Sequence, residues 1–137
     1  MKKIVLPLLL IFLFLGCENT SDENPLPVDT IEGKWVYPTP GSSTQISNTM
    51  YLFEDGIRYT YYCIDDDCES QYESFEAGDG NHIPGTNNYT FENDTLIIDL
   101  NFGNELVAPI RFECDGDKMY LEQTNPYYLL RLGSDCN

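Results

Sequence analysis

The chain has 137 residues, of which 23 are acidic and only seven are Lys or Arg, so that its formal net charge is −16. Removal of Lys2 and Lys3 with a signal peptide would take the charge of the mature chain to −18. Nucleic acid and anionic lipid headgroups are bound by clustered Lys and Arg, which this chain lacks, and both are therefore excluded as partners.

The first predicted element is an export signal over residues 1–16. Two lysines precede an apolar run from Ile4 to Leu15, which is the order found in signal peptides and is too short to span a bilayer. The following Gly16 and Cys17 resemble the lipobox of bacterial lipoproteins, in which the signal is cut before a cysteine that carries the lipid. The resemblance implies that Cys17 is lipidated and holds the protein on a membrane; a buried or disulfide-bonded Cys17 is the alternative.

Residues 17–30 predict a disordered tether, because acids, Asn, Ser, Thr and two prolines cannot bury a core. Acids close behind the lipidated cysteine also resemble the surface-export signals of Bacteroidota lipoproteins. That resemblance implies an outer-membrane anchor facing the medium. The alternative is that these acids only keep the linker solvated. In either case the expected location is the cell envelope.

Residues 31–137, about 105 in number, predict a single all-β domain of ordinary size. Apolar residues recur with period two, and the turn sequences EDG (54–56), END (92–94) and DGD (115–117) separate the runs. The candidate strands are 33–37, 49–53, 57–63, 69–76, 87–92, 95–102, 107–114, 118–123 and 127–132. An antiparallel up-and-down barrel closes with an even number of strands, so about eight strands are expected. Of the nine candidates, 69–76 is the one least expected to be a regular strand.

Two of these strands carry predictions about side-chain direction. In 57–63, Tyr59 and Tyr61 alternate with Arg58 and Thr60, and we expect the two tyrosines to line a pocket as ligand-binding residues while the polar pair faces outward. In 95–102, Leu96, Ile98, Leu100 and Phe102 are expected on one face. The turn-rich insert 77–88 is expected to form an exposed loop at the barrel mouth.

Four cysteines remain for disulfides in an exported chain. A hairpin from 57–63 into 69–76 would place Cys63 and Cys68 about 4.5 Å apart at Cα, which a disulfide allows. Cys114 and Cys136 would then pair with each other. Cross-pairing of Cys63 with Cys114 stays open, because these cysteines leave the barrel at the same end.

No residue pattern predicts an enzyme or a cofactor. His82 is the only histidine and lies in a loop rich in Gly and Asn, and no nucleophile motif surrounds a serine. Asp65, Asp66, Asp67 and Glu69 gather carboxylates that could hold Ca²⁺, but an ordinary hairpin tip has the same composition and no EF-hand spacing is present. No metal site is predicted.

The domain opens with GKW, containing Gly33 and Trp35, and its last strand carries Arg131. A G-x-W whose tryptophan is covered by an arginine of the last strand resembles the lipocalins. The further FEDG at 53–56 resembles the short lipocalin-like lipoproteins of Bacteroidota. The resemblance implies a non-enzymatic barrel that binds a small apolar or amphipathic ligand. The alternative is a barrel filled by its own side chains, which would be a structural or interaction lipoprotein contacting another envelope protein.

Overall fold

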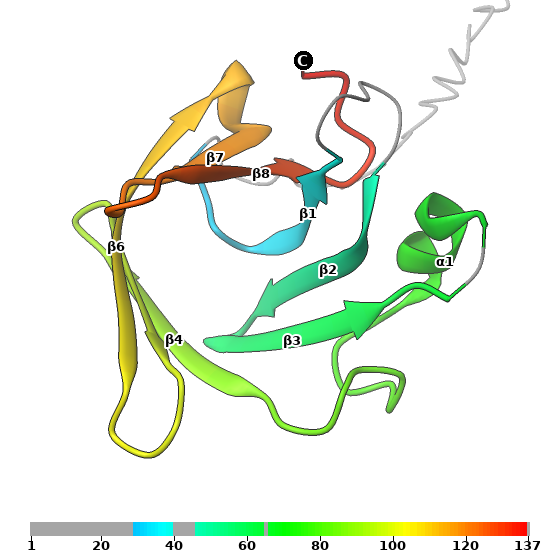
Figure 1. Ribbon diagram of the computed structural model, residues 1–137, viewed down its shortest axis with the longest axis horizontal. Coiled ribbons are helices and arrows are strands. Elements are labelled where there is room, and N and C mark those ends of the chain that lie inside the picture. The colour runs from blue at the N-terminus through cyan, green and yellow to red at the C-terminus, as the bar shows by residue number, and fades with distance from the viewer. Residues whose placement is uncertain (1–28, 40–45, 65, 137) are drawn as a thin grey trace, which may run out of the picture.

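The computed structural model describes residues 29–39, 46–64 and 66–136, and it shows a closed barrel of eight antiparallel strands (Figure 1). Each strand pairs with the next one along the chain, and β8 closes the barrel against β1. The elements are β1 Gly33–Pro38, β2 Ile46–Glu54, β3 Ile57–Tyr62, α1 Cys68–Ser74, β4 Asn87–Glu92, β5 Thr95–Asp99, β6 Glu105–Glu113, the 3-10 turn η1 Cys114–Gly116, β7 Lys118–Leu121 and β8 Tyr127–Arg131. The predicted all-β up-and-down barrel is confirmed.

Tight turns set the register of the hairpins. Asp55 and Gly56 both have positive φ, 50° and 77°, so that Glu54 pairs directly with Ile57. Asn93 and Asp94 have φ of 49° and 57° between β4 and β5. Positive φ at both central residues matches the twist of two-residue hairpins, and Asp, Asn and Gly adopt it most easily. The turns predicted at 54–56 and 92–94 are therefore present, for the expected reason.

The barrel interior holds the main apolar core. Its buried members come from seven of the eight strands and from the segment before β1: Ile31, Trp35, Phe53, Tyr89, Leu96, Ile98, Ala108, Ile110, Met119, Leu121 and Leu129. Successive residues of a strand point to opposite faces, so the residues between these positions face outward.

A second apolar cluster lies outside the barrel, against the outer face of β1, β2 and β3. It consists of Val36, Met50, Leu52, Tyr61, Cys63, Tyr72 and Phe75. Helix α1 supplies Tyr72, which is fully buried and whose hydroxyl lies 3.2 Å from the carbonyl oxygen of Ser47. Figure 1 shows α1 beside β2 and β3, outside the ring of strands. The first three strands are thus covered by protein on both faces.

The candidate strand 69–76 is instead α1 and the extended residues after it. Asp67 caps the helix, since its Oδ1 accepts a hydrogen bond from the backbone N–H of Ser70 (3.2 Å). Apolar Tyr72 and Phe75 are three residues apart, a spacing that puts both on the side facing the barrel. No helix among the described residues is long and apolar enough to cross a membrane.

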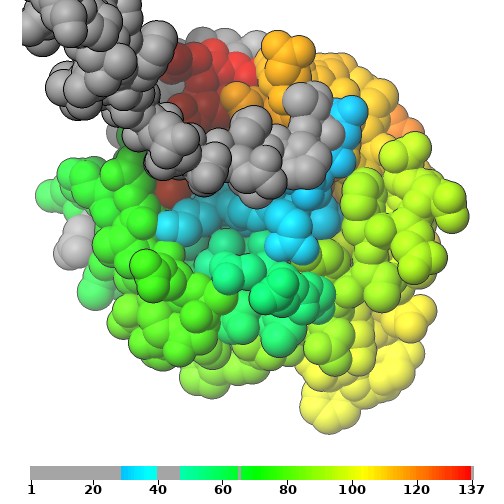
Figure 2. All heavy atoms as spheres, turned by 180° about the vertical axis from the view of Figure 1, so that it is seen from behind, coloured from blue at the N-terminus to red at the C-terminus, as the bar shows by residue number. Residues whose placement is uncertain are grey.

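The predicted strand 95–102 is too long, because β5 ends at Asp99. Asn101, Phe102 and Gly103 all have positive φ and form the turn into β6. Leu100 and Phe102 therefore do not share the inward face of Leu96, and the side chain of Phe102 is fully exposed. This β5–β6 hairpin, yellow in Figures 1 and 2, projects from the body of the barrel.

Candidate functional site

One end of the barrel is closed by Trp35 and Arg131. The Trp35 side chain is completely buried, and its indole N–H donates to the carbonyl oxygen of Ile31 (2.8 Å). The guanidinium carbon of Arg131 lies 4.4 Å from the centroid of the indole ring. Gly33 has φ of 116°, which favours glycine at the start of β1. The predicted arrangement of Gly33, Trp35 and Arg131 is confirmed, and we call this the closed end.

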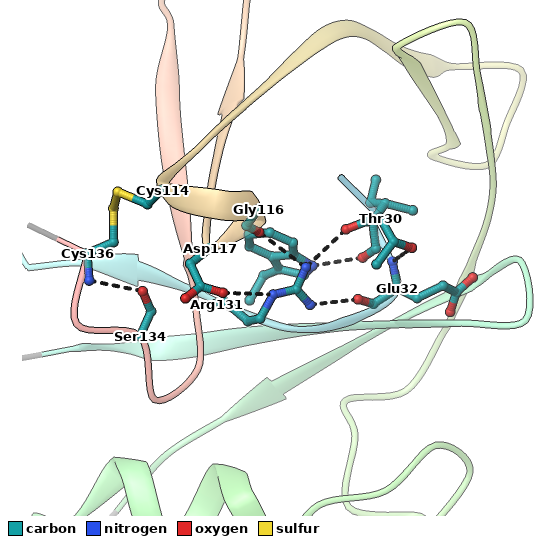
Figure 3. A network of polar contacts seen from close by, with 10 residues as sticks. Thr30, Glu32, Cys114, Gly116, Asp117, Arg131, Ser134 and Cys136 are labelled. Atoms are coloured by element: carbon teal, nitrogen blue, oxygen red, sulfur yellow. Dashed lines mark hydrogen bonds and ion pairs between the residues drawn. A yellow bond between two sulfur atoms is a disulfide. The ribbon is translucent and has the colours of Figure 1, made fainter. Parts of the chain in front are cut away.

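Arg131 makes four polar contacts at the closed end (Figure 3). It donates hydrogen bonds to the carbonyl oxygens of Glu32 (2.9 Å), Thr30 (3.1 Å) and Gly116 (3.2 Å), and its Nε lies 3.4 Å from Oδ1 of Asp117. Thr30, assigned from sequence to the tether, is therefore part of the barrel end. The contact is made by the backbone carbonyl of Thr30, which every residue type has, so the sequence did not indicate it.

Both predicted disulfides are present. Cys63 bonds Cys68 with a Cα–Cα distance of 5.3 Å, and Cys114 bonds Cys136 at 6.1 Å. The reason given for the first pair was wrong, since Cys68 begins helix α1 and does not lie on a hairpin strand. Helix α1 begins close enough to the end of β3 for Cys68 to bond Cys63, so a hairpin is not needed. Cys17 lies outside the described residues.

The prediction that Tyr59 and Tyr61 face a pocket inside the barrel is wrong. Tyr61 pairs with Met50 and Tyr59 with Leu52, and both partners belong to the outer cluster. Tyr61 stacks on Phe75 at 4.8 Å between ring centroids. The outer face of β3 is apolar because α1 and the segment after it cover that face, so aromatic side chains are buried there without lining the barrel.

The predicted insert 77–88 ends in the barrel wall, where Asn87 and Asn88 begin β4, and its earlier residues pack against β3. The ring of His82 lies 5.2 Å from that of Tyr59, and the backbone N–H of Ile83 donates to the carbonyl oxygen of Thr60 (2.9 Å). The only histidine of the chain is therefore part of the cover over β3. This placement differs from the loop at the barrel mouth that the sequence predicted.

The acidic loop between β3 and α1 has a structural role at Asp67, which caps the helix. Asp65 lies outside the described residues. Within the described part of the chain, no group of three or more His, Cys, Asp or Glu side chains is arranged to hold a metal ion.

Arg58 and Thr60, which were predicted to face outward, lie on the inward face of β3. Arg58 pairs with Phe53 and Thr60 with Tyr51, and both partners contribute to the interior core. Arg58 thus places a guanidinium inside the barrel. Its carbon atom lies 5.0 Å from the centroid of the Tyr51 ring.

Tyr51 packs with two further tyrosines, and we call Tyr37, Tyr51 and Tyr127 the tyrosine cluster. The Tyr37 ring lies 5.8 Å from that of Tyr51 and 5.5 Å from that of Tyr127. Tyr37 and Tyr127 lie at the ends of β1 and β8 opposite to Trp35 and Arg131. The cluster therefore lies on the side of the barrel away from the closed end, and its members are half-buried.

Burial raises the pKa of the phenols in this cluster. It raises the pKa of Tyr51 to about 12, an effect strengthened by hydrogen bonding to Tyr37, and it raises the pKa of Tyr37 and Tyr127 as well. A phenol is neutral at pH 7 even at its ordinary pKa of about 10, and the raised pKa keeps these phenols neutral at higher pH as well. Burial lowers the pKa of Arg58, but a guanidinium stays protonated in proteins.

Arg58 has few partners compared with Arg131. Its Nη2 donates to Oδ1 of Asn87 (2.5 Å), whereas its Nε–H is buried and makes no hydrogen bond among the described residues. Asn87 is held in place by a hydrogen bond from its Nδ2 to the carbonyl oxygen of Asp99 (2.7 Å). Among the residues that the structure describes, no carboxylate lies within 4.0 Å of the Arg58 nitrogens.

The pairing of strand β4 with β3 ends beside Arg58. Strand β4 pairs with β3 only through Asn88 with Ile57 and Asn87 with Arg58. Farther along β3, the carbonyl of Thr60 is bonded to Ile83 of the insert instead of to a residue of β4. Arg58 therefore lies where β3 and β4 separate.

A surface pocket of about 340 Å³ lies elsewhere, lined by Gly33, Lys34, Glu73, Arg131 and Leu132. It is shallow and lies between α1 and the outer side of β1 and β8. The Lys34 ammonium there is already hydrogen-bonded to the carbonyl oxygen of Glu73 (2.8 Å). Arg58 and the tyrosine cluster do not line this pocket.

Comparisons of the chain with protein-family models, with curated proteins and with solved structures returned no match. The candidate site therefore rests on its geometry. Sequence reasoning missed Arg58 and the tyrosine cluster because it placed the aromatic residues of β3 inside. The two-residue turn at Asp55 and Gly56 was a usable signal, since it pairs Arg58 with Phe53 and so puts both on one face.

Proposed function

We propose that this protein is a lipid-anchored, lipocalin-like protein of the cell envelope that binds a small amphipathic ligand inside its barrel, beside the tyrosine cluster. The observation that carries the proposal is that Trp35 is completely buried at one end of the interior, while Tyr37, Tyr51 and Tyr127 remain half-buried beside a cation. Tyrosine offers a broad apolar ring together with a hydroxyl, which suits an amphipathic ligand. Small barrels of eight strands can hold one such molecule.

The anchor in this proposal rests on the signal and lipobox pattern that ends at Cys17. A cell expressing the protein and fed an alkyne-tagged fatty acid should label the wild-type chain and retain it in the membrane fraction. A Cys17→Ala variant should lose both the label and the membrane retention, because no other cysteine follows an apolar export segment. Label that persisted in the variant would remove the anchor from the proposal.

Ligand uptake is tested with N-phenyl-1-naphthylamine, a neutral apolar probe that fluoresces in apolar surroundings. The wild-type domain should take up the probe. Tyr127→Ala should weaken uptake by up to about tenfold, since an aromatic contact contributes about 0.5–1.5 kcal/mol. Tyr128→Ala is the matched control, because Tyr128 is the next residue of β8, points outward and lies beneath Lys118 (4.4 Å). It should leave uptake unchanged.

A second function is favoured by the outer surface of the β5–β6 hairpin. Ile97 and Val107 are directly paired and 36% and 54% exposed, and Leu100 and Phe102 extend the apolar surface to the projecting tip. Exposed apolar residues that lie together mark protein contact sites. If the wild-type domain takes up no probe, the barrel is filled and an interaction lipoprotein using this hairpin becomes the better reading.

A further inference from the structure

We propose that Arg58 binds the carboxylate of the ligand, so that the protein selects amphipathic molecules carrying one negative charge. This inference rests on the proposed function and names the chemical class of its ligand. It is carried by a guanidinium that lies inside the barrel, contacts the Tyr51 ring of the tyrosine cluster and has no anionic partner among the described residues.

An unpaired cation inside a barrel is unfavourable unless something compensates it. Burying a charge without a partner costs several kcal/mol, and proteins normally pair such groups or engage all their donors. Arg131 shows the usual solution in the same barrel, with three carbonyl acceptors, an aspartate and a stacked indole. Arg58 donates to one amide oxygen and lies over one tyrosine ring, and its buried Nε–H makes no hydrogen bond among the described residues.

The arrangement around Arg58 suits a carboxylate. The guanidinium presents parallel N–H donors that match the two oxygens of a carboxylate, and phenol hydroxyls can add further donors. The hydrogen bonds from Arg58 to Asn87 and from Asn87 to Asp99 fix one side of the guanidinium, so its remaining donors are held in place before a ligand arrives. Such preorganisation lowers the entropy lost on binding.

The charge of the interior also limits the ligand to one negative charge. Among the described inward-facing strand residues, only Arg58 and Arg131 are cationic, and Arg131 is already paired with Asp117. A dianion such as a phosphate monoester would therefore keep one charge uncompensated in the barrel. The outer surface of this strongly acidic chain opposes anions without an apolar part, so the ligand needs apolar contact with the tyrosine rings as well.

The experiment compares decanoate with decanol, which have the same chain length and differ in charge. Each competes with N-phenyl-1-naphthylamine for the wild-type protein at pH 7. Decanoate should bind about tenfold more tightly than decanol, as expected for a charge-assisted hydrogen bond. In Arg58→Gln this preference should disappear through loss of decanoate affinity, with decanol affinity within about twofold of wild type.

Arg111→Gln is the matched control, because it removes the same charge from the outer surface, where Arg111 is paired with Glu113 and Glu122. It should preserve the preference for decanoate. Arg58→Met tests the same idea without ligand: since it removes a poorly paired interior charge, its melting temperature should equal or exceed that of wild type. The retained decanol affinity of Arg58→Gln shows that its loss of decanoate binding does not reflect loss of folding.

The outcomes separate the two proposals. Equal binding of decanoate and decanol by the wild-type protein would overturn the role of Arg58 and leave the ligand-binding function standing. Retention of the preference in Arg58→Gln would also overturn it. Failure of the probe, decanoate and decanol to bind at all would overturn both. A melting temperature of Arg58→Met well below that of wild type would show that Arg58 serves the fold.

Discussion

Trp35→Ala should destabilise the domain by about 3–5 kcal/mol, the largest effect expected for a single substitution in this chain. The substitution removes a completely buried ring from the closed end and takes away the surface on which Arg131 stacks. It also leaves the carbonyl oxygen of Ile31 without its indole donor. The free energy of unfolding should be measured by urea denaturation followed by far-UV circular dichroism, because Trp35 is the only tryptophan.

Trp35→Phe is the matched control for that measurement. It keeps an aromatic face for Arg131 and loses only part of the ring volume and the hydrogen bond to Ile31, so its loss should be clearly smaller than that of the alanine variant. A loss below about 1 kcal/mol in Trp35→Ala would contradict the view that Trp35 and Arg131 hold the barrel end together.

Removal of the disulfide between Cys114 and Cys136, by replacing both with alanine, should cost about 3 kcal/mol. The bond links residues 22 apart in sequence, and the entropy that a cross-link removes from the unfolded chain grows with loop length. It also joins the end of the chain to η1, whose Gly116 carbonyl accepts a hydrogen bond from Arg131. Urea denaturation under non-reducing conditions measures the loss.

The disulfide between Cys63 and Cys68 provides the comparison, because it closes a loop with a separation of only five and should contribute about 2 kcal/mol. Reducing agent should bring wild type and both double variants toward the same stability. If loss of the shorter bond were the more damaging, packing of Cys63 in the outer cluster would outweigh loop entropy, and the predicted order would be wrong.

Much of the barrel could be read from local sequence, because local chemistry decides it. Asp55 and Gly56 adopt positive φ with little strain, and the runs on either side alternate with period two, so the β2–β3 hairpin and its register follow directly. The same reasoning found β4, whose predicted and observed bounds are identical. Helix α1 was missed because it has seven residues and buries only one of them fully, too short for a period of 3.6 to be recognised.

The candidate site was less accessible from sequence, since it depends on which face of β3 points inward. In β2, Met50 and Leu52 are as apolar as Tyr51 and Phe53, so hydrophobicity does not distinguish the two faces. The ambiguity has a physical cause: α1 and the segment after it cover the outside of β1 to β3, and burial on both faces removes the usual contrast between apolar and polar positions.

The all-β class and the hairpin turns follow from the sequence, because each depends on residue type or on neighbours along the chain. The contact between Trp35 and Arg131 followed from the resemblance to lipocalins, and the structure decided between the disulfide pairings that the sequence left open. The three-dimensional packing places Tyr59 and Tyr61 outside the barrel and Arg58 inside it with Tyr37, Tyr51 and Tyr127. Those positions depend on barrel closure and on the packing of residues 68–83 over β3, which bring together segments far apart in sequence.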